Sequence, residues 1–225
     1  MTTLFKTRKG RAAGEATIII PTRDVSLEGD LAAPASAKGI VLFAHGSGSS
    51  RHSARNRFVA EALRQGELAT LLFDLLSADE ESIDLQTANL RFDIAFLSER
   101  LVAAIDWISN QEETRHLPIG LFGSSTGAAA ALVAAAQRPR LIGAVVSRGG
   151  RPDMADQVLP VVEAPTLLIV GAKDRSVIEM NQRAFSQLRC EKRIEIVPGA
   201  AHLFEEPGAL EQVSELAREW FTAHL

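Results

Sequence analysis

The chain alternates short, continuously apolar runs with longer stretches in which apolar residues recur at helical spacing. An apolar run that is bounded by glycine or polar residues is typical of a strand covered on both faces. Strands that alternate with helices form parallel βαβ units with right-handed crossovers, which restricts the fold class to α/β. The expected parallel strands are residues 39–46, 69–76, 119–124, 141–150, 166–174 and 193–200.

The segments between these runs complete an expected sheet with helices on both faces. Residues 15–33 contain two β-rich segments, for which we expect an antiparallel hairpin with a turn near Arg23–Asp24. The acidic and polar residues 77–87 show no apolar face and are interpreted as a loop. Apolar residues at helical spacing predict helices at 51–65, 126–137 and 177–189, a long helix from Leu90 to Ile108, and a final helix that includes Leu210 and Phe221.

The length fits one globular domain, and the net charge disfavours one class of partner. The chain has 225 residues, of which 46% are hydrophobic, and we find no repeat or linker, so residues 15–225 are expected to form a single domain. The basic residues 1–14 are expected to form a flexible tail. The net charge of −4 disfavours a nucleic-acid partner, because phosphate binding depends on clustered Lys and Arg side chains.

The single cysteine and the short apolar runs constrain the cellular setting. Cys190 alone excludes an internal disulfide and a cysteine-rich metal site. No apolar run reaches the roughly 18 residues of a membrane span. The N-terminus also lacks the apolar segment of a secretory signal. We therefore expect a cytoplasmic protein with no membrane partner.

A glycine-flanked serine follows one of the predicted strands, at the sheet edge where open parallel sheets bind their ligands. The segment Gly123-Ser124-Ser125-Thr126-Gly127 leads into an Ala-rich predicted helix. It fits the pattern G-x-S-x-G, in which a sharp strand-to-helix turn exposes a serine hydroxyl and the glycines avoid clashes. A serine-rich helix cap is the alternative interpretation. The position between strand and helix favours Ser125 as a nucleophile.

Two other strand ends supply the partners that a serine nucleophile needs. Asp174 ends one apolar run, at a place where a carboxylate can orient an imidazole. His202 follows the last predicted strand, and the near-neutral pKa of histidine suits a general base. The order Ser, Asp, His, each after its own buried strand, predicts a catalytic triad of Ser125, Asp174 and His202. Asp153, after the preceding strand, is the alternative carboxylate.

The glycine-rich segment His45-Gly46-Ser47-Gly48 follows an early predicted strand. Glycine allows backbone N–H groups of such a loop to turn into the site. The N–H groups of Ser47 and Thr126 are therefore the expected donors to the oxyanion of a tetrahedral intermediate. His45 is expected to order this loop. Its use as the catalytic base is the alternative, although it precedes the nucleophile in the chain.

The motifs HGSG, GSSTG, GAKD and GAAHLF together resemble the α/β-hydrolase superfamily from about residue 15 onward. The longer segments FAHGSGSSRHSARNRFVA, LRFDIAFLSERL, STGAAAALVAAA, VVSRGGRPDMA and IVPGAAHLFEEPG are similar to its dienelactone-hydrolase-like branch. Dienelactone hydrolases use a cysteine nucleophile, whereas this chain has Ser125 at that position and Cys190 lies elsewhere. The resemblance therefore implies an α/β-hydrolase fold and the hydrolysis of simple esters rather than of dienelactones.

The predicted activity is that of a serine hydrolase that forms an acyl-enzyme and needs no metal or organic cofactor. The connection at residues 151–164 has room for about one helix, so we expect a minimal lid and a small ester substrate. Arg148 and Arg51, with Arg55 and Arg151, are expected at the rim, where they either bind an anionic group or brace loops. Acyl transfer with the same triad and a non-catalytic binding protein are the alternative functions.

Overall fold

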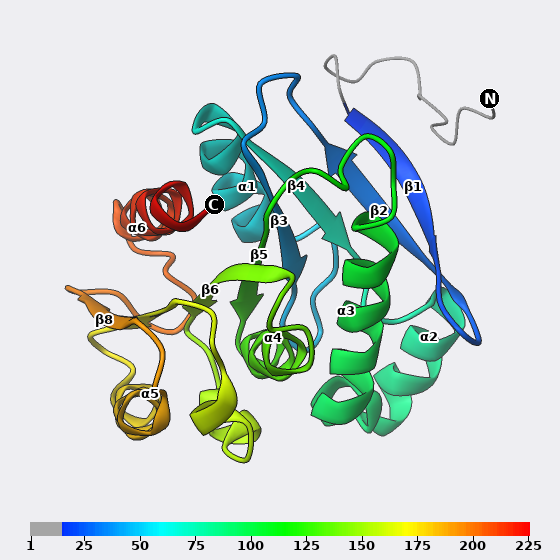
Figure 1. Cartoon of the computed structure of the whole chain (residues 1–225). Coiled ribbons are helices and arrows are strands. Elements are labelled where there is room, and N and C mark those ends of the chain that lie inside the picture. The colour runs from blue at the N-terminus through cyan, green and yellow to red at the C-terminus, as the bar shows by residue number, and fades with distance from the viewer. Residues whose placement is uncertain (1–14) are drawn as a thin grey trace.

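The computed structural model describes residues 15–225, which form an eight-stranded sheet of order β1-β2-β4-β3-β5-β6-β7-β8 (Figure 1). Strands β3 to β8 are parallel, whereas β2 lies antiparallel to both β1 and β4. The predicted α/β class and the N-terminal antiparallel hairpin are confirmed, and the predicted tail at residues 1–14 lies outside the described residues. The strands are β1 (Glu15–Pro21), β2 (Ser26–Ala32), β3 (Gly39–Ala44), β4 (Leu68–Phe73), β5 (Ile119–Ser124), β6 (Ile142–Arg148), β7 (Thr166–Gly171) and β8 (Lys192–Val197).

Helices cover both faces of the sheet. On one face α1 (Ala54–Gln65) packs against α6 (Ala209–His224), and on the other lie α3 (Ile94–Ile108), α4 (Thr126–Gln137) and α5 (Arg175–Gln187) (Figure 1). Strands β3, β4, β5 and β7 are buried along their whole length, because each face carries its own apolar core. Polar side chains therefore gather beyond the strand ends. None of the helices in residues 15–225 is long and apolar enough to cross a membrane.

The prediction of a loop at residues 77–87 is wrong, because Ala78–Thr87 form helix α2. A capping box begins this helix: Ser77 Oγ accepts the Glu80 N–H, and the Glu80 carboxylate accepts the Ser77 N–H. Asp84 is the one buried residue of α2, so the helix has no apolar stripe. The acidic and polar composition that indicates a loop is therefore compatible with a short helix that a capping box begins.

The predicted helix from Leu90 to Ile108 is interrupted near its start. Leu90–Phe92 form a single 3₁₀ turn, and α3 begins only at Ile94. Asp93 has an extended backbone at the junction, and its carboxylate accepts the Phe96 N–H at 3.0 Å. Asp93 thus ends the turn and caps the helix, because a capping residue has non-helical backbone angles.

The connection between β6 and β7 is formed by two short 3₁₀ turns, Pro152–Ala155 and Leu159–Val161. The sequence left room for about one helix here, and these turns occupy that room. The connection therefore adds little cover above the carboxyl edge of the sheet.

Candidate active site

The three residues of the predicted triad all follow strands in one half of the sheet, at its carboxyl edge. Ser125 follows β5, Asp174 follows β7 and His202 lies in the loop after β8. The Nδ1 atom of His202 lies 2.6 Å from Asp174 Oδ2, although the residues are 28 positions apart. The Asp174 side chain is 14% exposed and the His202 side chain is 40% exposed. The two side chains therefore have the arrangement of a base and its orienting carboxylate.

Ser125 occupies a strained turn between β5 and α4. Its backbone angles, φ 50° and ψ −121°, lie outside the regions that residues with a side chain normally adopt. The N–H groups of Ala128 and Arg151 both donate to the Ser125 carbonyl oxygen at 3.1 Å and hold the turn. Ser125 thus lies at the N-terminal end of α4, where the helix dipole favours negative charge.

The glycine after this turn allows α4 to begin directly against the end of β3. A Cβ atom at Gly127 would lie 2.2 Å from the Ala44 carbonyl oxygen and 2.5 Å from that of His45. No real side chain tolerates such distances. The loop after β3 also approaches Ser125, because a Cβ at Gly46 would lie 3.1 Å from Ser125 Cβ. The predicted oxyanion loop and the predicted nucleophile are therefore neighbours.

A hydrogen-bonded loop presents His202. The Ala201 N–H donates to both carboxylate oxygens of Glu206, at 3.0 and 3.1 Å. These hydrogen bonds hold the pKa of Glu206 below its ordinary value. On the other side, a Cβ at Gly149 would lie 3.6 Å from His202 Cε1, so the imidazole lies over the end of β6. Glu206 was not among the predicted site residues, and the available signal for it is an acidic residue in the same loop as the histidine.

The two predicted oxyanion donors are close together, but the Ser47 N–H already donates a hydrogen bond within the protein. The Ser47 N–H donates to Thr126 Oγ1 at 3.1 Å, which joins the loop after β3 to the first turn of α4. An oxyanion has to compete with this hydroxyl for the Ser47 N–H. The Thr126 N–H belongs to the first turn of α4, where N–H groups have no acceptor within the helix. The catalytic role of these two N–H groups stays a prediction.

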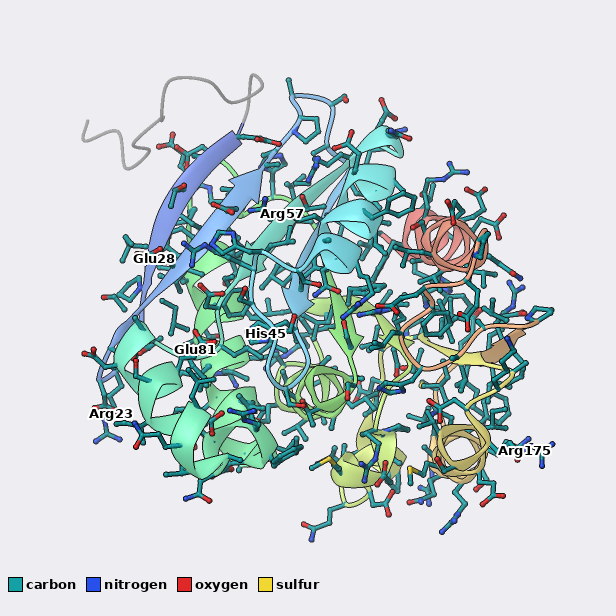
Figure 2. The ribbon with its side chains drawn as sticks, turned by 180° about the vertical axis from the view of Figure 1, so that it is seen from behind. Arg23, Glu28, His45, Arg57, Glu81 and Arg175 are labelled. Atoms are coloured by element: carbon teal, nitrogen blue, oxygen red, sulfur yellow. The ribbon has the colours of Figure 1, made fainter. Side chains whose placement is uncertain are left out.

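His45, labelled in Figure 2, is the first residue of the loop after β3, and its side chain is buried. Its Nδ1–H donates to the Gly46 carbonyl oxygen and its Nε2 accepts the Leu75 N–H, both at 3.0 Å. Burial lowers the pKa of His45 despite opposing effects of the Gly46 carbonyl and nearby carboxylates. With both ring nitrogens occupied, His45 is suited to ordering the loop and not to acting as the catalytic base.

Two of the arginines predicted at the rim are bound by carboxylates. Arg51 donates to Asp74 through its backbone N–H at 2.7 Å and through its guanidinium. Arg151 donates to both carboxylate oxygens of Asp153, at 2.9 and 2.8 Å. These contacts brace loops, so Arg51 is no longer favoured as a substrate contact. Asp153 is bound to Arg151, which leaves Asp174 as the carboxylate beside His202.

Of the other two rim arginines, Arg55 also has a carboxylate partner, whereas Arg148 has none in the described part of the chain. Arg55 pairs with the exposed Glu205 at 2.9 Å. Arg148 is only 7% exposed, and its guanidinium donates to the Asn56 side-chain oxygen at 3.2 Å. Arg148 therefore lies deeper than a rim residue, with a neutral partner.

A pocket opens beside the predicted oxyanion loop. Helix α2 and the turn after it form one wall, which the expectation of a loop at residues 77–87 does not predict. The pocket lining combines the apolar Leu75, Leu76, Leu85 and Leu97 with Ser47, Thr126, Glu81, Asp84 and Arg91, among others.

Residues 15–225 hold no group of three or more His, Cys, Asp or Glu side chains arranged for a metal ion.

Solved structures share this architecture. A dienelactone hydrolase from Anabaena variabilis ATCC 29413 is 59% identical, with a TM-score of 0.93 over 94% of this chain and 98% of that chain. An alpha-beta serine hydrolase homologue from Coxiella burnetii is 18% identical, with a TM-score of 0.75 over 93% of this chain and 99% of that chain. At that identity the second likeness shows the fold alone.

Comparison of sequences gives the family. A curated protein of Mycobacterium tuberculosis (strain H37Rv), named "Putative phosphoribosyl transferase", is 55% identical over 201 residues, which are 89% of this chain and 44% of that protein. The chain thus spans less than half the length of this relative, and the activity in its name is not carried over. Residues 27–223 match the family model described as "Dienelactone hydrolase family". Together with the Anabaena structure, this match shows that the chain belongs to the dienelactone hydrolase family, within the α/β-hydrolase superfamily.

Proposed function

We propose that this protein is a serine hydrolase that cleaves small carboxylic esters through an acyl-enzyme at Ser125. The observation that carries the proposal is the 2.6 Å contact between His202 Nδ1 and Asp174 Oδ2, at the edge that also holds the strained Ser125 turn. Family membership supports hydrolysis, and the serine mechanism is inferred from these side chains. The short β6–β7 connection supports a small or accessible ester.

The Asp174 carboxylate sets the tautomer of His202 in this mechanism. Because the carboxylate accepts the Nδ1–H, the Nε2 atom keeps its lone pair and serves as the base. His202 takes the Ser125 hydroxyl proton while the serine oxygen bonds to the ester carbonyl carbon. The protonated His202 then gives this proton to the departing alcohol, and the acyl-enzyme remains.

The same histidine completes the reaction with water. His202 removes a proton from a water molecule as its oxygen attacks the acyl-enzyme carbonyl carbon. Collapse of the second tetrahedral intermediate releases the carboxylic acid and returns the proton to the Ser125 oxygen. None of these steps needs a metal or an organic cofactor.

The proposed oxyanion donors are the N–H groups of Thr126 and Ser47. In the resting protein the Ser47 N–H donates to the neutral Thr126 hydroxyl. Hydrogen bonds to an ionised acceptor are about twice as strong as those to a neutral acceptor. A developing oxyanion therefore draws the Ser47 N–H from the hydroxyl as the intermediate forms.

Substitution of the three triad residues tests the mechanism. Ser125→Ala and His202→Ala are each expected to lower kcat/KM for p-nitrophenyl acetate by about 10⁴-fold or more, and Asp174→Asn by about 10⁴-fold. Ser125→Ala is also expected to abolish labelling by a fluorophosphonate probe. Ser186→Ala, at an exposed serine of α5, and Cys190→Ala are the matched controls and should keep wild-type turnover.

Undiminished turnover by the Ser125→Ala protein would overturn the mechanism. Preferential transfer of the acyl group to an added alcohol instead of water would replace hydrolysis by acyl transfer at the same triad.

A further inference from the structure

Arg148 carries a buried positive charge without an ion-pair partner among residues 15–225. The residue ends β6, and its Nε atom is buried with no hydrogen-bond partner. Its guanidinium donates to Asn56 Oδ1 at 3.2 Å. Asn56 is itself buried and also accepts a hydrogen bond from Ser124 Oγ at 3.1 Å. Arg148 is thus oriented by a fixed neutral group and keeps unused donor capacity.

Other arginines of the chain show what a bracing role requires. Four of them are more exposed than Arg148, yet each of these four has a carboxylate partner, and Arg100, which is as buried as Arg148, pairs with Glu80. A buried charge without a counter-ion is costly, so a residue needed only for packing would be expected to have such a partner too. The pairs are Arg51–Asp74, Arg91–Asp84, Arg138–Asp106 and Arg151–Asp153.

A second guanidinium lies near the first. Burial, and after it the charge of Arg55, lower the pKa of Arg148 to about 10, which leaves the guanidinium charged at neutral pH. Arg55 binds Glu205 at 2.9 Å, while its own Nε atom is buried without a hydrogen-bond partner. Of these two neighbouring cations among the described residues, Arg55 has one exposed carboxylate as its partner, and Arg148 has none.

Arg148 also lies next to the proposed reaction centre. In the sheet it pairs with Ser124, the residue before the nucleophile, and its carbonyl oxygen accepts the Ser125 N–H at 3.4 Å. The next residue, Gly149, faces the imidazole of His202. A group bound by Arg148 is therefore within reach of the same small substrate that Ser125 attacks.

We propose that Arg148, together with Arg55, binds an anionic group of the ester substrate, either a carboxylate or a phosphate. This inference rests on the serine-hydrolase proposal, because both place the substrate in one site. A guanidinium donates two parallel N–H bonds to a carboxylate or to two phosphate oxygens, and the bound anion supplies the acceptor that Arg148 Nε lacks. The preferred substrates are then acidic esters.

Matched esters of one chain length test the inference. The three substrates are p-nitrophenyl hexanoate, mono-p-nitrophenyl adipate and a p-nitrophenyl hexanoate whose terminal carbon carries a phosphate. We expect the wild type to show a kcat/KM about tenfold or more higher for an anionic ester than for the neutral ester. The preferred anion distinguishes a carboxylate site from a phosphate site.

Variants of Arg148 should change this preference. Arg148→Met is expected to lower the anionic-to-neutral ratio of kcat/KM about tenfold or more. Arg148→Lys should recover part of the ratio, because the charge remains while the two-bond contact is lost. Arg138→Met removes a guanidinium that pairs with Asp106 on α3, and it should leave the ratio at the wild-type value.

A measurement on the wild type covers the case in which Arg148 variants do not fold. Adipate or inorganic phosphate should inhibit hydrolysis of p-nitrophenyl hexanoate competitively, and more weakly at high salt. Absence of inhibition by both anions, or an unchanged ratio in folded Arg148→Met, would overturn the inference and leave Ser125-dependent hydrolysis standing. Hydrolysis that survives Ser125→Ala would overturn the proposed function instead.

Discussion

His45 joins two loops on which the candidate site depends. Its ring connects Gly46, in the loop after β3, to Leu75, in the loop after β4. Only a neutral imidazole donates with one nitrogen and accepts with the other. Protonation would place a second donor opposite the Leu75 N–H inside the protein. The position of the predicted oxyanion loop therefore depends on the protonation state of one buried histidine.

His45→Gln should change how stability depends on pH. In the unfolded chain His45 titrates near its ordinary pKa of about 6.5, whereas its pKa in the folded protein is lower. Above pH 6.5 both states are neutral and the His45 contribution is complete. Below pH 6.5 the unfolded state binds a proton that the folded state rejects, so folding is destabilised as the pH falls towards the folded pKa.

The measurement is the thermal unfolding midpoint of both proteins between about pH 7.5 and pH 5. The variant should be less stable by about 1–3 kcal/mol at the upper pH, because the Gly46 and Leu75 groups lose good partners. It should also lose less stability than the wild type on acidification. Parallel curves for the two proteins would contradict a role for His45 in the pH dependence.

At the scale of elements, α2 shows that a helix can be specified by its ends rather than by an apolar face. The capping box at Ser77 begins it, and Asp84 connects it to the chain that follows. The Asp84 carboxylate accepts the N–H groups of Leu90 and Arg91 at 2.7 and 3.1 Å and the Arg91 Nε–H at 2.6 Å. These polar contacts place one wall of the pocket beside the oxyanion loop.

Ser77→Ala is expected to destabilise α2 by about 1 kcal/mol, because the Glu80 N–H loses its acceptor. Backbone amides of residues 78–88 should then exchange with deuterium faster, while the central strands stay protected. Ser82→Ala is the matched control, since Ser82 is an exposed serine inside the same helix. Equal exchange rates in the two variants would show that the cap does not hold this wall.

In the molecule as a whole, the candidate site lies at the carboxyl ends of the strands. An apolar anchor, the side chain of Leu225, lies at their amino-terminal ends. Leu225 packs over glycines at the amino-terminal ends of three adjacent strands: Gly39, Gly120 and Gly143. A Cβ at any of them would lie 2.8 to 3.0 Å from the leucine side chain, so these glycines leave room for it. The anchor fixes the end of α6 against the sheet, far from Ser125.

Leu225→Ala should therefore lower stability and spare the catalytic chemistry. We expect a loss of about 1–3 kcal/mol, because a partly buried leucine leaves a cavity over the three glycines. Leu141→Ala, at a leucine that is 39% exposed, serves as the control and should change stability much less. Both proteins should keep the wild-type kcat/KM at 25 °C. A large loss of turnover in folded Leu225→Ala would contradict the separation of anchor and site.

The fold class and the candidate triad could both be predicted from local sequence patterns. Buried parallel strands need continuous apolar runs, so the positions of these strands can be predicted from short segments of sequence. The boundaries of β5 and α4 match the predicted ranges. Ser125, Asp174 and His202 could be identified because the carboxyl ends of parallel strands meet at one edge. Topology alone therefore predicts their proximity, and the contact between His202 and Asp174 agrees with it.

Contacts between residues that no local sequence pattern connects can be identified only in the tertiary structure. The sequence showed four arginines near strand ends, but only packing shows that Arg51 has a carboxylate partner and that Arg148 is buried beside a neutral one. The same holds for the hydrogen bond from Ser47 to Thr126, whose residues are 79 positions apart. Periodicity reports which face of an element is buried, whereas charge partners and hydrogen bonds depend on which distant elements meet.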